Sequence, residues 1–170
     1  MADGAIRIAG FDPGLSRTGW GVIEAAGTKL THIANGVIST KSSAPLGERL
    51  AELHAALREI LATHEPHAVA VEQAFVAKDP SAALKLGHAR AIALLAAAEA
   101  GLELAEYAPN QIKKSVVGVG HAGKEQVEAM VRRLLPGSQA AADAADALAC
   151  AIAHAHHSGT RARIAAALIR

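Results

Sequence analysis

The stretch IRIAGFDPGLSRTGWGV, residues 6–22, decides how the chain is built. An apolar run ends in one carboxylate, Asp12, which is followed at once by a Pro-Gly breaker. A second apolar run then begins through Gly19 and Gly21. Short apolar runs separated by turn residues indicate a β-hairpin. The stretch therefore predicts a hairpin with an acid at the end of its first strand.

Alternation along this first strand places Asp12 at the rim of the core. Side chains of a strand alternate between its two faces, so Ile8, Gly10 and Asp12 share one face, whereas Ala9 and Phe11 point to the other. A carboxylate in this position is suited to hold a cation. The alternative is that Asp12 only opens an Asp-Pro-Gly turn, because Asp, Pro and Gly all favour turns for local reasons.

The composition predicts one globular domain. The chain has 170 residues, of which 51% are hydrophobic and 19% charged, and this profile argues against disorder. The formal net charge of +1 does not indicate a nucleic-acid partner, so any basic surface must be confined to one part of the molecule. Cys150 is the single cysteine, which excludes an internal disulfide and a multi-cysteine zinc site. We expect it to be a small buried residue on a helix.

The chain shows no sign of a membrane partner. Its N-terminus lacks the basic-then-apolar layout of a signal peptide. The longest apolar run, residues 91–98, is far shorter than the roughly 20 residues needed to cross a bilayer. We therefore expect a cytoplasmic protein.

Periodicity predicts an α/β domain. Strands are expected at residues 20–26 and 30–39, completing a three-stranded antiparallel meander, and later at 66–73 and 102–107. Helices are expected from Pro45, over 81–100, from Pro109, over 124–135 and over 141–157. Strands reached through helical crossovers run parallel, so the sequence predicts a five-stranded mixed sheet flanked by helices. In the first helix, leucines recur at helical spacing, and Arg49 is expected outside their buried stripe.

Two carboxylates mark the last predicted helix. Asp143 and Asp146 are the only Asp, Glu, Lys or Arg residues between Pro136 and Thr160. Residues three apart lie on one helix face, and an unpaired buried carboxylate is costly. A simpler account lets Asp143 stabilise the helix N-terminus and Asp146 face water, which explains one acid better than two. Three histidines lie near the end of the same helix: His154, His156 and His157. Because no cysteine partners or second histidine pair stand at a suitable spacing for zinc, we expect a solvent-exposed helix end here.

Together the acids suggest metal-dependent phosphoryl chemistry. Glu72 ends the strand predicted at residues 66–73, so it repeats the placement of Asp12. Asp12, Glu72, Asp143 and Asp146 would supply oxygen donors from three separate elements, the ligands that Mg²⁺ and Mn²⁺ prefer. A pair of such ions supports in-line phosphodiester hydrolysis.

Five blocks of the sequence resemble the RuvC family of Holliday-junction resolvases, in the same order and with the same internal spacing. They are FDPGLSRTGWG, VEQAFVAK, ALKLGHAR, YAPNQIKKSVVGVGHAGKEQV and DAADALA. The resemblance implies an RNase H-like nuclease domain over residues 1–157, followed by a C-terminal tail of unknown role at residues 158–170. It also implies a homodimer that nicks four-way junction DNA with Mg²⁺, for which Mn²⁺ would substitute. We expect two ions per active site and a branch-migration motor complex as a partner.

The resemblance also assigns roles to residues. Asp12, Glu72, Asp143 and Asp146 would be the catalytic, metal-binding acids, and Phe75 would stack at the opened junction. Lys113 and Lys124 would contact DNA. A local charge excess agrees, because residues 109–135 hold five Lys or Arg, Lys114 among them, against two Glu. We therefore add Lys114 to the expected DNA contacts.

Two other functions are compatible with parts of the sequence. The first is a catalytically silent junction-binding protein, which the complete acid set argues against. The second is a fragment of an actin-like phosphotransferase, because DPGxSxTGxG resembles the phosphate-binding hairpin of that superfamily. Those proteins need a second half with its own nucleotide motifs, and 170 residues leave no room for it.

Overall fold

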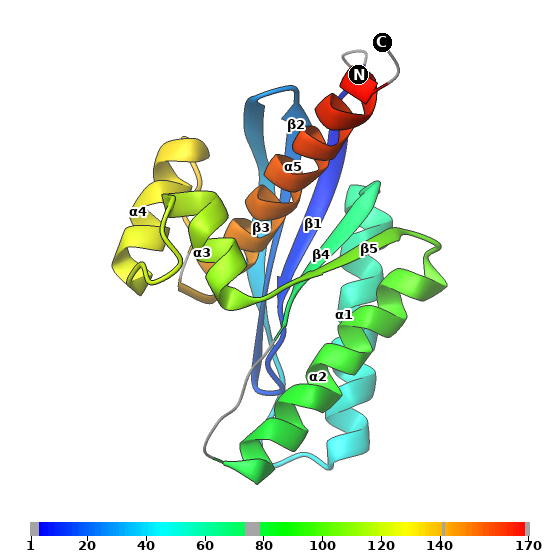
Figure 1. Cartoon of the computed structure of the whole chain (residues 1–170). Helices are drawn as coiled ribbons and strands as arrows, with labels where there is room; N and C mark the ends of the chain where they lie inside the picture. Colours follow the sequence, from blue (N-terminus) through cyan, green and yellow to red (C-terminus); the bar gives the residue numbers. More distant parts are fainter. Residues whose placement is uncertain (1–3, 74–78, 141, 169–170) are drawn as a thin grey trace.

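The computed structural model describes residues 4–73, 79–140 and 142–168, with side chains described through residue 159. Five strands and five helices follow one another along this part of the chain (Figure 1). They are β1 (Ile6–Asp12), β2 (Arg17–Ala26), β3 (Lys29–Ser39), α1 (Leu46–His64), β4 (Ala68–Glu72), α2 (Pro80–Glu99), β5 (Glu103–Tyr107), α3 (Pro109–Val117), α4 (Lys124–Leu134) and α5 (Ala142–Leu168).

The strands form one mixed sheet in the order β3-β2-β1-β4-β5. β1, β2 and β3 pair antiparallel, whereas β4 runs parallel to β1 and β5 runs parallel to β4. The predicted meander with two parallel strands is confirmed. The parallel strands lie beside the meander because each is reached through a helix, α1 or α2.

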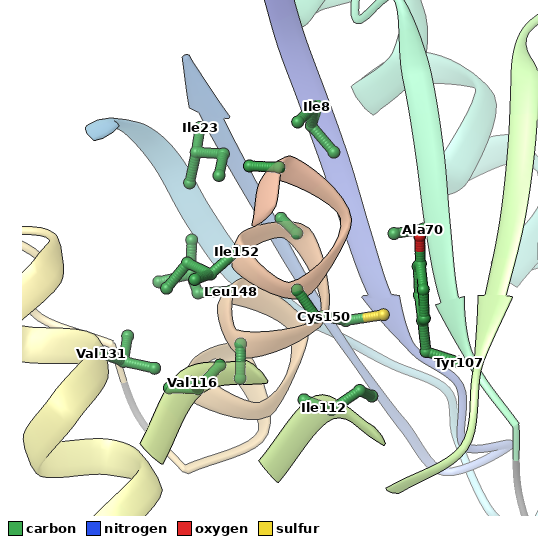
Figure 2. Close-up of a cluster of buried hydrophobic side chains, with 14 of the residues drawn as sticks. Ile8, Ile23, Ala70, Tyr107, Ile112, Val116, Val131, Leu148, Cys150 and Ile152 are labelled. Carbon is green, nitrogen blue, oxygen red and sulfur yellow. The ribbon is translucent and has the colours of Figure 1, made fainter. Parts of the chain in front are cut away.

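Helices cover both faces of the sheet (Figure 1). α1 and α2 pack on one face, where Phe11 and Ala9 meet the leucines of α1 and the alanines of α2. α5 packs on the other face, with α3 and α4 beside it, and Ile8 and Ala70 point there (Figure 2). The alternation predicted for β1 is therefore confirmed, and Asp12 belongs to the face that α5 covers.

Glycines let α5 approach the sheet closely. A methyl group on Gly10 of β1 would lie 2.0 Å from the carbonyl oxygen of Ala147. The same group on Gly19 of β2 would lie 1.9 Å from the carbonyl oxygen of Asp143. No real side chain tolerates such distances, so the helix backbone rests directly against the strand backbones. These hairpin glycines are therefore required by packing.

The structure differs from the sequence predictions in two helices, α1 and α5, and in one strand, β2. β2 begins at Arg17, before the expected residue 20, because it pairs with β1 up to Gly19 opposite Asp12 and with β3 up to Arg17 opposite Ser39. α5 continues to Leu168, past Ser158 and Gly159, where we expected it to end. A glycine inside a helix costs only about 1 kcal/mol, which good helix formers offset.

Arg49 on α1 is buried, contrary to the prediction, at 8% exposure. Its guanidinium donates hydrogen bonds to the Leu15 carbonyl, the Ser16 hydroxyl and the Thr40 hydroxyl. The leucine spacing located the buried stripe, with Leu53 and Leu57 at its centre, but it could not show that the β1–β2 turn needs donors from α1.

His154 is also buried, at 2% exposure, so the predicted solvent-exposed helix end is wrong at this residue. Its Nδ1 lies 3.0 Å from the hydroxyl of Tyr107 on β5. His156 is exposed, as expected, and Cys150 is confirmed as a buried residue of α5. None of the helices in the described part of the chain combines the length and apolar character needed to span a membrane.

We predict that Gly10→Ala destabilises the fold by about 3 kcal/mol or more, since the added methyl group meets backbone atoms of α5 that have no room to yield. Urea unfolding followed by circular dichroism measures the change. The matched control is Gly47→Ala on α1, where nothing lies within 4 Å of the new methyl group. We expect this control to stay within about 1 kcal/mol of wild type. A loss below 1 kcal/mol for Gly10→Ala would contradict the packing argument.

Candidate active site

Two of the predicted acids lie at the ends of neighbouring strands. Asp12 is the last residue of β1 and Glu72 is the last residue of β4. The two strands are parallel, and Phe11 pairs with Val71, so the next residue along each strand brings the two carboxylates side by side. Their placement follows from strand register alone.

α5 supplies the other two acids through its contact with the sheet. The carbonyl of Asp143 lies against Gly19, and Gly19 is the residue of β2 that pairs with Asp12. Asp143 lies in the first turn of α5, and Asp146 follows one turn later. The packing that glycine permits therefore brings the helical acids next to the strand-end acids.

Asp12, Glu72 and Asp146 line one cavity of about 320 Å³. Lys113 from α3 and Lys124 from α4 share its wall with apolar side chains. The cavity therefore combines acids that suit a cation with lysines that suit an anion. Asp143 does not line it.

Asp12 and Glu72 strongly perturb each other. Burial, followed by the charges of Glu72, Asp146 and Asp143, raises the pKa of Asp12 from 3.8 to about 8. Burial and Asp146 also raise the pKa of Glu72. The side-chain contact with Asp12 partly offsets this rise in the pKa of Glu72. Burial and the neighbouring acids therefore disfavour the ionised form of both carboxyl groups.

The helical acids are paired with cations of the protein itself. Arg17 Nε donates to Asp143 Oδ2 at 2.6 Å, and Lys124 Nζ lies 2.9 Å from Asp146 Oδ2. The hydrogen bond to Asp146 raises the pKa of Lys124. Both contacts are partly exposed, so a competing ion can displace them at small cost.

The donor set fits a hard divalent cation. All four groups are carboxylates, and burial together with the neighbouring acids raises the pKa of both Asp12 and Glu72, which a bound cation would offset. Within the described residues, no three His, Cys, Asp or Glu side chains are already arranged to hold a metal ion. Asp143 and Asp146 are paired instead with Arg17 and Lys124.

Not every predicted DNA contact lies at the cavity. Lys113 and Lys124 line it, whereas Lys114 lines a separate hollow with Ser115, His156 and His157. Phe75 lies outside the described residues. The roles of Lys114 and Phe75 in DNA binding stay predictions.

Sequence reasoning missed two arginines that shape this region. Arg17 holds Asp143, and Arg49 fixes the turn that precedes Arg17. Arg17 could have been noticed, because it is the first basic residue after Asp12 in the sequence. No feature of the sequence indicates the role of Arg49, because that role depends on the packing of α1 beside the turn.

The family model described as "Crossover junction endodeoxyribonuclease RuvC" matches residues 8–154. Curated relatives of that description include one from Parvibaculum lavamentivorans, 60% identical over 98% of this chain and 95% of the relative. Another, from Azorhizobium caulinodans, is 56% identical over 99% of this chain and all of the relative. A solved structure, T. thermophilus RuvC in complex with Holliday junction substrate, aligns with a TM-score of 0.85. It is 37% identical, and the match covers 91% of this chain and 96% of that one.

The mixed sheet, its flanking helices and the acids at its edge define an α/β protein of the RNase H-like fold. Within that class, the chain belongs to the RuvC family of crossover junction endodeoxyribonucleases. The resemblance seen in the five sequence blocks is thereby confirmed.

We predict that Asp12→Asn stabilises the metal-free protein at pH 8. Below pH 3.8, Asp12 is protonated in the folded and the unfolded states and costs nothing. As the pH rises toward 8, the unfolded state releases this proton but the folded state keeps it, so folding stability falls. The variant has no such loss. In EDTA its melting temperature should exceed that of wild type by roughly 3 °C or more at pH 8.

The difference in melting temperature should grow from pH 5 to pH 8 and shrink when Mn²⁺ is added. Glu59→Gln, which removes an exposed carboxylate from α1, is the matched control and should show no such pH dependence. A difference that narrows between pH 5 and pH 8 would contradict the electrostatic account.

Proposed function

We propose that this protein is a structure-selective endodeoxyribonuclease that resolves four-way DNA junctions by paired, symmetric nicks. One observation carries the proposal. In a chain of the RuvC family, carboxylates from two adjacent strand ends and from α5 meet at one cavity, and lysines from α3 and α4 line the same cavity. The related T. thermophilus RuvC is described in complex with Holliday junction substrate, which supports junction DNA as the ligand here.

We further propose Mg²⁺ as the cofactor, with Mn²⁺ as a substitute and two ions per site. Asp12, Glu72 and Asp146 would hold the metal, joined by Asp143 once it leaves Arg17. Bound ions would supply an activated water and stabilise the leaving oxygen of the hydrolysed phosphodiester. The support is the all-carboxylate donor set and the raised pKa of Asp12, which a nearby dication would lower.

The residues of the cavity divide the remaining work. Lys113 and Lys124 would bind phosphates of the cut strand and position it. Phosphate contacts fix the register and orientation of DNA on a protein without reading its base sequence. Before DNA binds, Lys124 is paired with Asp146. Loading of the site would therefore free Lys124 for a phosphate.

A homodimer would place two such sites on one junction. α2 supports this proposal, since it exposes 66% of Leu84 and 47% of Leu95 on the helix whose Ala89, Ala93, Ala96 and Ala97 are buried against the sheet. The predicted cytoplasmic location and the branch-migration motor complex remain proposals made on the family resemblance.

The two competing functions are less well supported. A silent junction-binding protein would have no need for three carboxylates in one cavity. An actin-like phosphotransferase would need a second half, whereas the described chain pairs with whole RuvC relatives over 95% or more of their length.

The direct test is a cleavage assay. The purified protein is incubated with Mg²⁺ and a labelled synthetic four-way junction, beside linear duplex of the same sequence and beside ATP. Paired nicks confined to the junction support the proposal. Junction binding without cutting would instead favour the silent protein, and ATP turnover would favour the phosphotransferase.

We predict that Asp12→Asn abolishes cleavage but leaves junction binding within roughly twofold of wild type. The substitution removes a metal ligand and no phosphate contact. Gel shift in EDTA measures binding, and single-turnover kinetics measure cleavage. Cutting at the wild-type rate would show that Asp12 is not a ligand.

We predict that Lys124→Ala lowers cleavage and flattens the salt dependence of junction binding. Loss of one phosphate contact should reduce the slope of log affinity against log salt by about 0.9. Lys29→Ala is the matched control, because Lys29 is exposed at the start of β3, at the opposite end of the sheet from Asp12. An unchanged slope for Lys124→Ala would remove it from the DNA contacts.

A further inference from the structure

Asp143 differs from the other three acids in its surroundings. It lies outside the cavity that Asp12, Glu72 and Asp146 line, and Arg17 holds it at 2.6 Å. Yet its backbone carbonyl lies against Gly19, the residue of β2 that pairs with Asp12, so Asp143 stands close to the cavity. The contact with Arg17 therefore keeps Asp143 beside the cavity but engaged elsewhere.

The backbones on both sides of this ion pair are fixed. Asp143 is held where its carbonyl meets Gly19. Ser16, which precedes Arg17, accepts a hydrogen bond from the buried Arg49 through its hydroxyl and another from the Thr40 amide through its carbonyl. Rearrangement of the pair therefore needs only side-chain rotation.

The pair itself is easy to open. The Arg17 side chain is 60% exposed and that of Asp143 is 30% exposed. Ion pairs this accessible to water typically change an equilibrium by no more than about fivefold. A divalent cation at the cavity, or an anion at Arg17, can therefore compete for either partner.

Arg17 suits a phosphate of DNA. A guanidinium has five N–H donors in a planar fork that matches phosphate oxygens, and the contact with Asp143 uses only the Nε–H. Lys41, also exposed, follows Thr40, whose backbone amide binds the Ser16 carbonyl. Arg17 at the start of β2 and Lys41 after the end of β3 are thus two exposed cations on segments separate in the chain from Lys113 and Lys124.

We propose that Arg17 exchanges Asp143 for a phosphate of the bound strand, so that Asp143 turns to the metal only when DNA is in place. Arg17 is then a positioning residue that couples DNA binding to completion of the metal site. This inference rests on the proposed nuclease function and extends it by naming the group that delays assembly of the site.

Binding of Mn²⁺ to the DNA-free protein, measured by calorimetry, tests whether Arg17 keeps Asp143 away from the metal. Arg17→Gln should bind Mn²⁺ roughly two- to fivefold more tightly than wild type, because nothing then competes for Asp143. Without Asp143 the gain in Mn²⁺ affinity should disappear. The double variant Arg17→Gln with Asp143→Asn should therefore bind Mn²⁺ as tightly as Asp143→Asn alone. Unchanged Mn²⁺ affinity, or a gain that persists without Asp143, would overturn the proposal.

Junction binding in EDTA at several salt concentrations tests whether Arg17 binds a phosphate of the DNA. Arg17→Gln should weaken binding and lower the salt slope by about 0.9, whereas Arg17→Lys should keep most of the slope. Arg58→Gln, on an exposed arginine far along α1, is the matched control and should change neither the Mn²⁺ affinity nor the salt slope. A slope for Arg17→Gln equal to that of wild type would overturn the exchange.

Cleavage by wild-type protein separates this inference from the function on which it rests. If wild type does not cut four-way junctions, the nuclease proposal fails, whatever Arg17 does to Mn²⁺ binding. If wild type cuts and the Arg17 variants match it in Mn²⁺ affinity and salt slope, only the exchange fails.

Discussion

The site depends on how closely α5 lies against the first hairpin. Gly10 and Gly19 leave the strand backbones bare, so the carbonyls of Ala147 and Asp143 occupy space that any side chain would fill. Because interiors are close-packed and transmit strain, a displacement of α5 would move both helical acids together. The register of β1 with β4 places the other two acids independently of the helix. One packing contact thus joins two pairs of carboxylates into one site.

The closeness of these acids is electrostatically unfavourable without an added cation. Burial and the neighbouring carboxylates raise the pKa of Asp12 to about 8, and Asp143 and Asp146 pair with Arg17 and Lys124. Such perturbed groups gather where a protein carries out chemistry. The same two cations belong to the surface that would meet DNA. Metal loading and DNA binding are therefore expected to favour each other, since each releases groups that the other uses.

Much of this arrangement could be predicted from the sequence, and the exceptions have physical reasons. Alternation along β1 placed Asp12 on the correct face, and the acids three apart on α5 indicated a shared direction. The burial of Arg49 and of His154 escaped prediction, because it depends on hydrogen-bond partners that distant segments supply, the β1–β2 turn in one case and Tyr107 in the other. The separation of Asp143 from the cavity escaped for the same reason, as it depends on the position of the Arg17 side chain. Periodicity reports which face a residue occupies, and not which partner it meets there.

The most direct test of the account is anomalous diffraction from crystals of the protein soaked in Mn²⁺. The account predicts a peak within about 2.3 Å of carboxylate oxygens of Asp12 and Glu72, with Asp146 turned toward it and away from Lys124. Asp143 should stay with Arg17 in crystals without DNA. A peak at another set of residues, or none beside Asp12 and Glu72 at saturating Mn²⁺, would contradict the account.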